Sequence, residues 1–425
     1  MKIEKEIQMQ VKNYYEKQVQ DKLHEIYGPM PPIECVTRVF QELKFMRGKS
    51  YFQDLGLICA LKNMAYAEGI PLFLESYSGS SFVAWLLGAS RVNPLPPHRY
   101  CPRCHKVEFF YDEKDGWNLP SAFCCGEEMK TDGHNIPFDS IANNNSGNGF
   151  YLSFQISDSL RDRCIEIVHE YYQVAGVQIV PVHSRFMGRP EESETAFALI
   201  PEDDEMPPLN NDGIWHSDDH ELYEKGYKTI EFRSTPKMNE IAELSLKTEK
   251  RPDLNARSSL NSLRDVYDEL IMEYPYFTDV PLSADGDLDF SSIFPLFAYS
   301  SGTEDWGREE ISLFKKNNVT LKDLFTTRED VIYEILSHSS LYYGDGRSFA
   351  YDVMENTRKG KYAHGGVPEE TIRLLQGMGV PEYLIAQIMK TRYLPPKDAM
   401  LELILNYEVL SNYRSLIDYS PKEVS

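Results

Sequence analysis

The sequence predicts an α+β protein in which a mixed half, residues 1–236, precedes an α-helical half, residues 237–425. Two observations support this class. Short apolar runs with strand character all lie before residue 236, at 70–74, 149–157, 177–183, 195–201 and 227–234. Helical periodicity then dominates residues 237–272 and 304–414. A chain of 425 residues is long enough for roughly two or three domains, so we place a domain boundary near residue 236.

Glycine and proline delimit the first predicted helix. Residues 3–27 carry apolar residues at helical spacing and end at Gly28, which is followed by PMPP, so a helix stops there. Residues 34–68 predict two further helices. The segment DSLRDRCIEIVHEYY, residues 158–172, has an amphipathic helical pattern for which Asp158 is the expected N-cap.

The charge balance is strongly acidic. The chain contains 44 basic and 66 acidic residues, which gives a net charge of −22. Residues 190–225 are the most acidic stretch and include the run Glu202 to Glu205. We interpret this stretch as a solvated acidic loop, and a docking surface for a basic partner is the second interpretation. Because affinity for a phosphate backbone requires Lys and Arg, the stretch argues against binding to nucleic acid.

Two features of the sequence suggest where in the cell the protein is located. The N-terminus lacks the apolar core of a signal peptide, and no window approaches the roughly twenty apolar residues that span a bilayer. We therefore expect a cytoplasmic protein without membrane contact. The cysteine count is low, and Cys35, Cys59 and Cys164 occur singly in apolar or helical contexts, so we expect them to be reduced core residues.

Four other cysteines have the chemistry of a metal site. Cys101 and Cys104 form a Cys-x-x-Cys knuckle, and Cys124 and Cys125 are adjacent. Four thiolates satisfy the tetrahedral preference of zinc, but adjacent side chains diverge and reach one ion only if the backbone bends. His105 or His134 are the alternative ligands. We favour a structural zinc over a metal-free remnant, and a catalytic zinc lacks the His-Glu-x-x-His pattern that would support it.

Several motifs occur in the order found in one protein family. They include SGSSFVA at 78–84, VNPLPPHRYCPRCHKVEFF at 92–110, DGHNIPFD at 132–139, AYDVMENTRKGK at 350–361 and VPEYLIAQIMKTRYLPPKDA at 380–399. In this collinear arrangement they resemble the catalytic core of PolC-type bacterial DNA polymerase III alpha subunits. The segment around the cysteines is the most specific part of the resemblance.

The resemblance implies a particular architecture. Residues 1–236 would form a nucleotidyltransferase-like palm with a small zinc-knuckle insertion at 99–139 and a shortened thumb-like region at 157–200. Residues 237–425 would form the helical fingers-like domain. The family's zinc site has two Cys-x-x-Cys knuckles, and the second has lost its spacer residues here. We also expect the family's DNA-gripping parts to be missing.

The resemblance also locates the catalytic positions of the palm. A polymerase needs two magnesium ions about 3.5–4 Å apart, held by carboxylates on adjacent strands. The family's first two aspartates align with Gly149 and Tyr151, and the third aligns with Glu231. Mg²⁺ requires near-octahedral oxygen coordination, which a glycine and a phenol do not supply. We therefore expect no catalytic residues and no bound Mg²⁺, with Asp158 a poor substitute.

The nucleotide-binding loop is altered as well. The family has an arginine ahead of the SGSSFVA motif, and Glu75 stands at that position, followed by Ser78, Gly79 and Ser80. Replacing a cation with an anion beside a triphosphate inverts the interaction. The resemblance therefore implies a degenerate nucleotide loop.

The fingers-like half departs from the family too. Ser301 stands where the family has a histidine, and Asp398 with Ala399 replaces an Ala-His pair. The remaining cations form either a basic patch or ordinary exposed charge at helix ends, and we favour the second interpretation. These cations are Arg358, Lys359, Lys361 and Lys397.

Together these observations lead to one functional hypothesis and two alternatives. The leading hypothesis is a catalytically inactive homologue of the PolC-type core that binds another protein in DNA replication or repair. Its partner would be a replisome component or another copy of the chain. The first alternative is an active or residual DNA polymerase or nucleotidyltransferase that uses Glu231. The second is a non-catalytic DNA-binding module, which the acidic charge disfavours.

Overall fold

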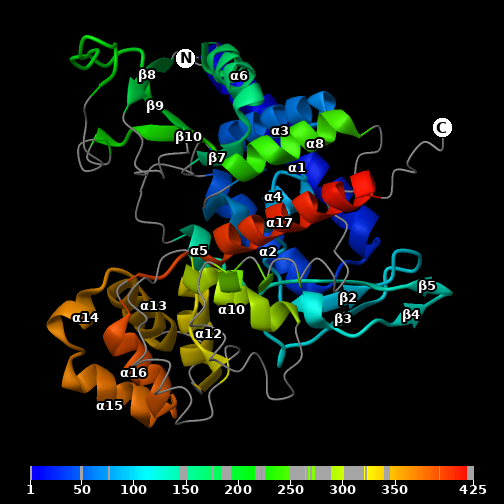
Figure 1. Ribbon diagram of the computed structural model, residues 1–425, viewed down its shortest axis with the longest axis vertical. Helices are drawn as coiled ribbons and strands as arrows, with labels where there is room; N and C mark the ends of the chain where they lie inside the picture. The colour runs from blue at the N-terminus through cyan, green and yellow to red at the C-terminus, as the bar shows by residue number, and fades with distance from the viewer. Residues whose placement is uncertain are drawn as a thin grey trace.

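The computed structural model of the chain shows a mixed sheet covered by helices, a projecting β-arm and a separate group of helices (Figure 1). The structure describes residues 2–47, 51–74, 77–142, 152–173, 177–182, 193–215, 225–248, 289–300, 323–338, 345–391 and 393–418, with positions 222, 264, 267, 268, 270–272 and 320. Within these ranges, no helix is both long and apolar enough to cross a bilayer. The predicted α+β class is confirmed.

The main sheet has five strands in the order β1-β7-β10-β9-β8. They are β1 (Phe73–Leu74), β7 (Leu152–Ile156), β8 (Val177–Val182), β9 (Ser193–Pro201) and β10 (Lys228–Ser234). Strands β7 and β10 run parallel, and the other neighbouring pairs are antiparallel. Each predicted strand segment therefore contributes to one sheet, although β1 contains only two residues.

The centre of this sheet is buried on both faces, as a strand between two layers must be. All five residues of β7 are buried, and the rings of Phe154 and Phe232 stack with centroids 5.5 Å apart. The N-terminal helices and the helix after β7 bury their apolar sides in the same core. These helices are α1 (Lys2–Tyr27), α2 (Ile33–Arg47), α3 (Tyr51–Glu68), α4 (Phe82–Leu86) and α6 (Arg161–Gln173).

The expected end of the first helix is confirmed, and the expected cap of α6 is wrong. Gly28 ends α1 with a φ of 81°, a conformation that glycine adopts without strain. Asp158 does not cap α6, because a 3₁₀ turn that includes it precedes the helix. Its carboxylate instead accepts hydrogen bonds from Ser234 Oγ at 2.6 Å and Asn239 Nδ2 at 2.8 Å. Asp158 thus joins the ends of β7 and β10.

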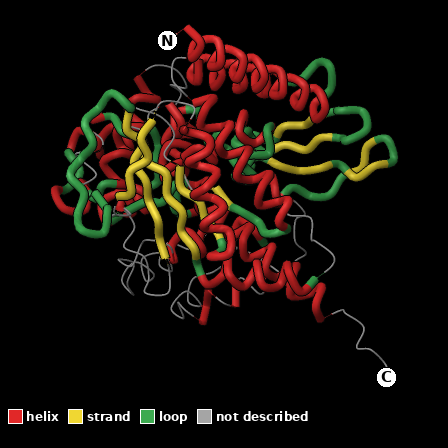
Figure 2. Tube along the Cα trace, turned by 90° about the horizontal axis from the view of Figure 1, so that it is seen from above, coloured by secondary structure: helices red, strands yellow, loops and turns green. Residues whose placement is uncertain are grey.

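A β-arm projects from the body beside the N-terminal helices (Figures 1 and 2). We call residues 98–134 the arm. A three-stranded sheet forms its base and a two-stranded hairpin forms its tip. The base strands are β2 (His98–Tyr100), β3 (Val107–Phe109) and β6 (Lys130–Asp132), and the tip strands are β4 (Phe123–Cys124) and β5 (Glu127–Glu128).

The second half of the described chain is helical, as predicted. Most of its helices gather below the sheet, whereas the last one returns to the sheet and lies along α8 (Figure 1). The helices are α8 (Pro236–Lys247), α10 (Phe290–Ser300), α12 (Arg328–His338), α13 (Asp345–Arg358), α14 (Lys361–Gly365), α15 (Glu369–Gly377), α16 (Glu382–Lys390) and α17 (Lys397–Asp418). The boundary near residue 236 stays a prediction, since α8 packs against both β7 and α17.

Candidate functional site

The arm brings four cysteine side chains together at its tip. The Sγ atoms of Cys101, Cys104, Cys124 and Cys125 all lie within 4.8 Å of one another. The Cys104–Cys124 distance is 3.5 Å and the Cys124–Cys125 distance is 3.8 Å. A zinc–sulfur distance of about 2.3 Å places the sulfurs of a tetrahedral site about 3.8 Å apart. The donor set therefore fits a metal ion such as zinc.

A tight turn explains how adjacent cysteines reach the same point. Cys124 pairs with Glu127 across β4 and β5, so Cys125 and Gly126 are the two turn residues of a hairpin. Their φ angles are 55° and 82°, the left-handed conformation that a type I′ turn requires at both positions. The bent backbone that two adjacent ligands would require is present, and the turn brings both sulfur atoms to the same point.

The first knuckle has the backbone geometry of a thiolate-binding turn. The backbone N–H of Cys104 points to Cys101 Sγ at 3.5 Å, and the N–H of His105 donates to the Cys101 carbonyl at 2.9 Å. The backbone N–H of Lys106 and the neighbouring thiols lower the pKa of Cys104 to about 7, whereas the hydrogen bond with Cys104 raises the pKa of Cys124 to about 12 and also raises the pKa of Cys125. Without a metal ion, Cys104 is therefore the thiol of these three that most readily becomes the thiolate, the form that binds metals.

The two histidines offered as alternative ligands have other partners. His105 Nδ1 lies 3.0 Å from the carbonyl of Ile26, which attaches the arm to the end of α1. His134 is fully buried, and its Nδ1 lies 2.6 Å from Asp115 Oδ2. Within the described residues, neither histidine belongs to the group of converging donors.

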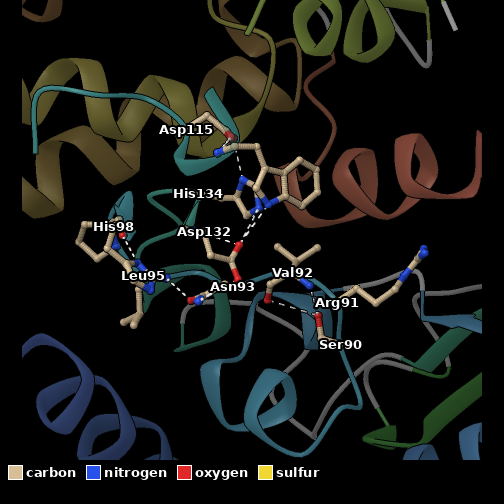
Figure 3. A network of polar contacts seen from close by, with 12 residues as sticks. Ser90, Arg91, Val92, Asn93, Leu95, His98, Asp115, Asp132 and His134 are labelled. Carbon is tan, nitrogen blue, oxygen red and sulfur yellow. Dashed lines mark hydrogen bonds and ion pairs between the residues drawn. The ribbon is translucent and has the colours of Figure 1, made fainter. Parts of the chain in front are cut away.

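A buried polar network anchors the base of the arm (Figure 3). Asn93 donates to Asp132 Oδ2 at 3.3 Å, and Trp117 Nε1 donates to Asp132 Oδ1 at 3.1 Å. On the other side, His98 Nε2 lies 2.9 Å from the hydroxyl of Tyr27 on α1. Because buried polar groups need such partners, this network fixes the direction in which the arm projects.

The expected catalytic region lies where β7 and β10 run side by side. Glu231 on β10 is 3% exposed and is paired in register with Ser153 on β7 and Ala196 on β9. The expected degenerate positions Gly149 and Tyr151 lie outside the described residues. The two described strands contain one acidic residue, Glu231. That single carboxylate cannot form a two-metal site alone.

The loop that resembles a nucleotide loop is held by α2. Glu42, which is fully buried, accepts hydrogen bonds from the backbone N–H groups of Phe82 and Val83, both at 2.9 Å, and from Ser81 Oγ at 2.6 Å. Arg38 donates to the carbonyl of Ser80 at 2.9 Å. Carboxylate oxygens thus already occupy the N–H groups at the start of α4, where an anion would otherwise bind.

The start of α17 covers the same loop. A Cβ added to Gly79 would lie 2.8 Å from Asp398 Oδ2, so this carboxyl group touches the loop directly. Ser80 and Asp398 are both fully buried, and Ser78 and Gly79 lie in the same 3₁₀ turn. Glu75, at the expected arginine position, lies outside the described residues. The described part of the loop is closed by an acidic side chain.

Asp398 lies in a strongly desolvating environment. Burial raises the pKa of its carboxyl group well above the usual range, and the nearby Glu329 raises it further. Among the residues that the structure describes, none makes a hydrogen bond of good geometry to either carboxyl oxygen. The sequence identified Asp398 only as a replacement, since nothing in its neighbours indicates contact with a loop far away in the chain.

The structure also joins α17 to the sheet through residues that the sequence analysis did not single out. Arg91 donates to Glu402 Oε2 at 2.6 Å and to Asn406 Oδ1 at 2.8 Å, and Asn406 donates to Gln155 of β7 at 3.0 Å. The guanidinium of Arg91 also lies over the ring of Phe73, 3.9 Å from its centroid. The four-residue spacing of Glu402 and Asn406 on one helix was the available signal.

Three of the four cations singled out in the second half of the chain have acidic partners. Arg358 and Lys359 both pair with Glu355, and Lys397 lies 3.8 Å from Asp330. Lys361 is exposed in the first turn of α14, and Ser301 lies outside the described residues. With three of the four cations paired, this group forms no strong basic patch. The expectation of ordinary exposed charge is wrong for Lys397, which is only 5% exposed because it packs at the start of α17.

Comparison with known proteins identifies similar chains. No protein-family model matches the sequence. The DNA polymerase III PolC-type of Lacticaseibacillus paracasei is 24% identical over 88% of the chain, and that of Caldanaerobacter subterraneus is 24% identical over 89%. The protein of the same description from Thermotoga petrophila is 25% identical over 88%. The chain is PolC-like.

The chain matches only part of the length of each of these relatives. The chain spans 30%, 31% and 32% of the lengths of the three proteins. This similarity agrees with the resemblance seen in three motifs. Motif 78–84 lies in the 3₁₀ turn η1 (Tyr77–Ser80) and α4, motif 92–110 contributes β2 and β3 at the base of the arm, and motif 132–139 includes Asp132 and His134 of the anchoring network.

Proposed function

We propose that this PolC-like chain is a non-catalytic relative of the polymerase core that acts by binding another protein in DNA replication or repair. The observation that carries the proposal is the β7–β10 pair, which has Glu231 as its one carboxylate, with Gly149 and Tyr151 at the other two expected positions. Asp398, buried against Gly79 and Ser80, supports it further, since triphosphate binding would require this acid to move.

The test is primer extension by the purified chain with Mg²⁺ or Mn²⁺, beside a PolC-type polymerase as positive control. The matched negative controls are the variants Glu231→Ala and Glu231→Gln, of which the second keeps the size of the buried side chain. We expect the wild-type chain to extend no more primer than either variant. Extension above both variants would overturn the proposal.

The competing proposal is a polymerase or nucleotidyltransferase that uses Glu231, and the names of the relatives favour it. It requires Mg²⁺-dependent binding of a nucleoside triphosphate, because the metal bridges the phosphates to the enzyme. Isothermal titration with a deoxynucleoside triphosphate, with and without Mg²⁺, separates the two proposals. We expect no Mg²⁺-dependent heat, and a clear binding isotherm would favour the enzyme.

We also propose that the four cysteines hold a structural zinc ion. Cys101, Cys104, Cys124 and Cys125 supply the ligands, and the ion would tie the knuckle after β2 to the β4–β5 hairpin. Four thiolates leave no open coordination position for a substrate or water. The zinc would therefore stabilise the tip of the arm and take no part in chemistry.

A further inference from the structure

Helix α2 carries apolar side chains on the face that points away from the core. Ile33, Val36 and Phe40 are 70%, 41% and 62% exposed, and Met30, just before the helix, is 89% exposed. Spacings of three and four residues place the helical members side by side. The opposite face of α2 is buried in the main core, whereas an outer face is normally polar. We call these four residues the α2 face.

Charged residues around the α2 face are unevenly distributed. At its N-terminal end, Glu34 accepts a hydrogen bond from the hydroxyl of Tyr111 in the arm. The arm residues that follow, Asp112 and Glu113, are both exposed. At the opposite end of the helix, Lys44 is exposed. The hydrogen bond between Tyr111 and Glu34 therefore brings the arm segment that carries Asp112 and Glu113 to the same end of the apolar stripe as Glu34.

This charge pattern selects among the possible occupants of the α2 face. Nucleic acid and anionic lipid surfaces need basic residues, so the three carboxylates oppose both. A second copy of the chain would bring a further charge of −22. Such a copy would offer mainly Lys44 from its own α2, because Arg47 is paired with Glu16 at 2.8 Å and Arg38 with Glu42. A basic protein segment has none of these disadvantages.

We propose that the α2 face binds an amphipathic helix of another protein, with apolar residues on one side and Lys or Arg at the end that meets Glu34, Asp112 and Glu113. This inference rests on the proposed protein-binding function and names the surface and the partner class. Helices recognise such faces through anchors spaced three and four residues apart. Phe40 is the expected main anchor, since aromatic side chains dominate such interfaces.

Site-specific photocrosslinking tests the proposal. A photoreactive phenylalanine replaces Phe40 in the full chain, and a matched variant carries it at Leu246 of α8, an exposed apolar residue away from the α2 face. After irradiation in host cells, the crosslinked peptides are sequenced by mass spectrometry. We expect the Phe40 position to capture a helical peptide of another protein with an apolar stripe flanked by Lys or Arg.

Three outcomes would overturn the proposal. They are capture of the chain's own peptides, which would indicate a second copy, capture of acidic or non-helical peptides, and a yield at Phe40 no greater than at Leu246. A synthetic copy of the captured helix should then bind the wild-type chain at least tenfold more tightly than the Phe40→Glu variant. The Leu246→Glu variant should bind it as the wild type does.

Primer extension separates this inference from the proposed function. If the wild-type chain and the Phe40→Glu variant both extend a primer, the non-catalytic proposal is wrong, but a basic helix crosslinked at Phe40 would still support binding at the α2 face. If the chain extends no primer and Phe40 captures no such helix, only the proposal that the α2 face binds a basic helix is wrong. Circular dichroism of the Phe40→Glu variant confirms its folding, which we expect because Phe40 is exposed.

Discussion

The cysteine tip of the arm and the central β7–β10 strand pair of the main sheet are two regions where, by the resemblance, the sequence departs from the PolC pattern. At the tip, the resemblance implies that two spacer residues are missing, yet four sulfur donors converge within 4.8 Å. At the strand pair, it implies that Gly149 and Tyr151 replace two carboxylates, and Glu231 is the one acid within β7 and β10. The tip has a complete set of four metal ligands, whereas the two described strands have a single carboxylate.

The difference shows what a backbone can restore. A deleted spacer changes only the path of the chain, and the left-handed turn at Cys125 and Gly126 provides another path to the same point. A carboxylate supplies the oxygen ligands themselves, and no rearrangement of Ser153 or Ala196 supplies the negative charge that Mg²⁺ needs. A shortened spacer therefore leaves the metal ligands able to converge, whereas the replacement of a carboxylate removes the ligand itself.

The largest expected effect is at the tip of the arm. Replacing the buried Cys101 with serine removes one of four ligands, so bound zinc should fall from about one ion per chain to a small fraction of that. Metal analysis of the purified protein and limited proteolysis of the arm measure the change. Cys59→Ser, on α3, is the control and should keep its zinc. Equal zinc contents in both variants would contradict the proposal that the cysteines at the tip of the arm bind zinc.

The next effect concerns the 3₁₀ turn at Tyr77–Ser80, which Asp398 covers. Because burial raises the pKa of the Asp398 carboxyl group, the folded chain keeps its proton up to a higher pH than the unfolded chain does. The contribution of this carboxyl group to the free energy of unfolding is fully present below the unfolded pKa of about 3.9. It is lost as the pH rises toward the pKa of the folded chain. Asp398→Asn should therefore raise the free energy of unfolding at pH 7 by about 1–3 kcal/mol, and by less at pH 5.

Urea denaturation at both pH values measures this prediction. The exposed Asp112 provides the control, because Asp112→Asn should change the free energy of unfolding little at either pH. A loss of stability in Asp398→Asn would mean that the carboxylate is ionised and stabilised in the folded chain. The surroundings of this loop would then tolerate a charged group, and the loop would no longer differ from the arm in lacking stabilised ionised ligands.

The smallest effect tests the turn that replaces the missing spacer. Gly126 has a φ of 82°, and a Cβ added there would meet nothing within 4 Å, so a substitution acts through the backbone alone. Gly126→Ala should cost about 1–2 kcal/mol, whereas Gly126→Asn should cost less because Asn tolerates this conformation. A competition titration with a zinc-binding dye should show weaker zinc affinity for the alanine variant. Equal affinities of both variants would contradict the role of the turn.

Local patterns predicted the elements of the fold better than the contacts between them. Gly28 with its prolines marked the end of α1, and the apolar runs marked all five strands of the main sheet. The arm strands escaped notice because two or three residues are too few to show a period of two. Asp158 was wrongly expected to cap α6, since a sequence pattern does not reveal the competing partners Ser234 and Asn239.

The same limit applies to the candidate site. The four cysteines could be chosen from the sequence because their spacing is local and their chemistry is specific. The contact of Asp398 with Gly79 depends on how α17 returns to the sheet, and no local pattern encodes that path. The α2 face was missed for a related reason. Its apolar residues resemble core residues in sequence, and only the structure separates the exposed from the buried side of the helix.

The return of α17 to the sheet also has a consequence for synthesis on the ribosome. Phe73 on β1 and Met238 and Ile241 on α8 share one apolar cluster with Leu410 and Tyr413 of α17. Translation produces the first three long before the last two. The nascent chain therefore exposes this apolar surface until α17 leaves the exit tunnel, and we expect it to depend on chaperones during that interval.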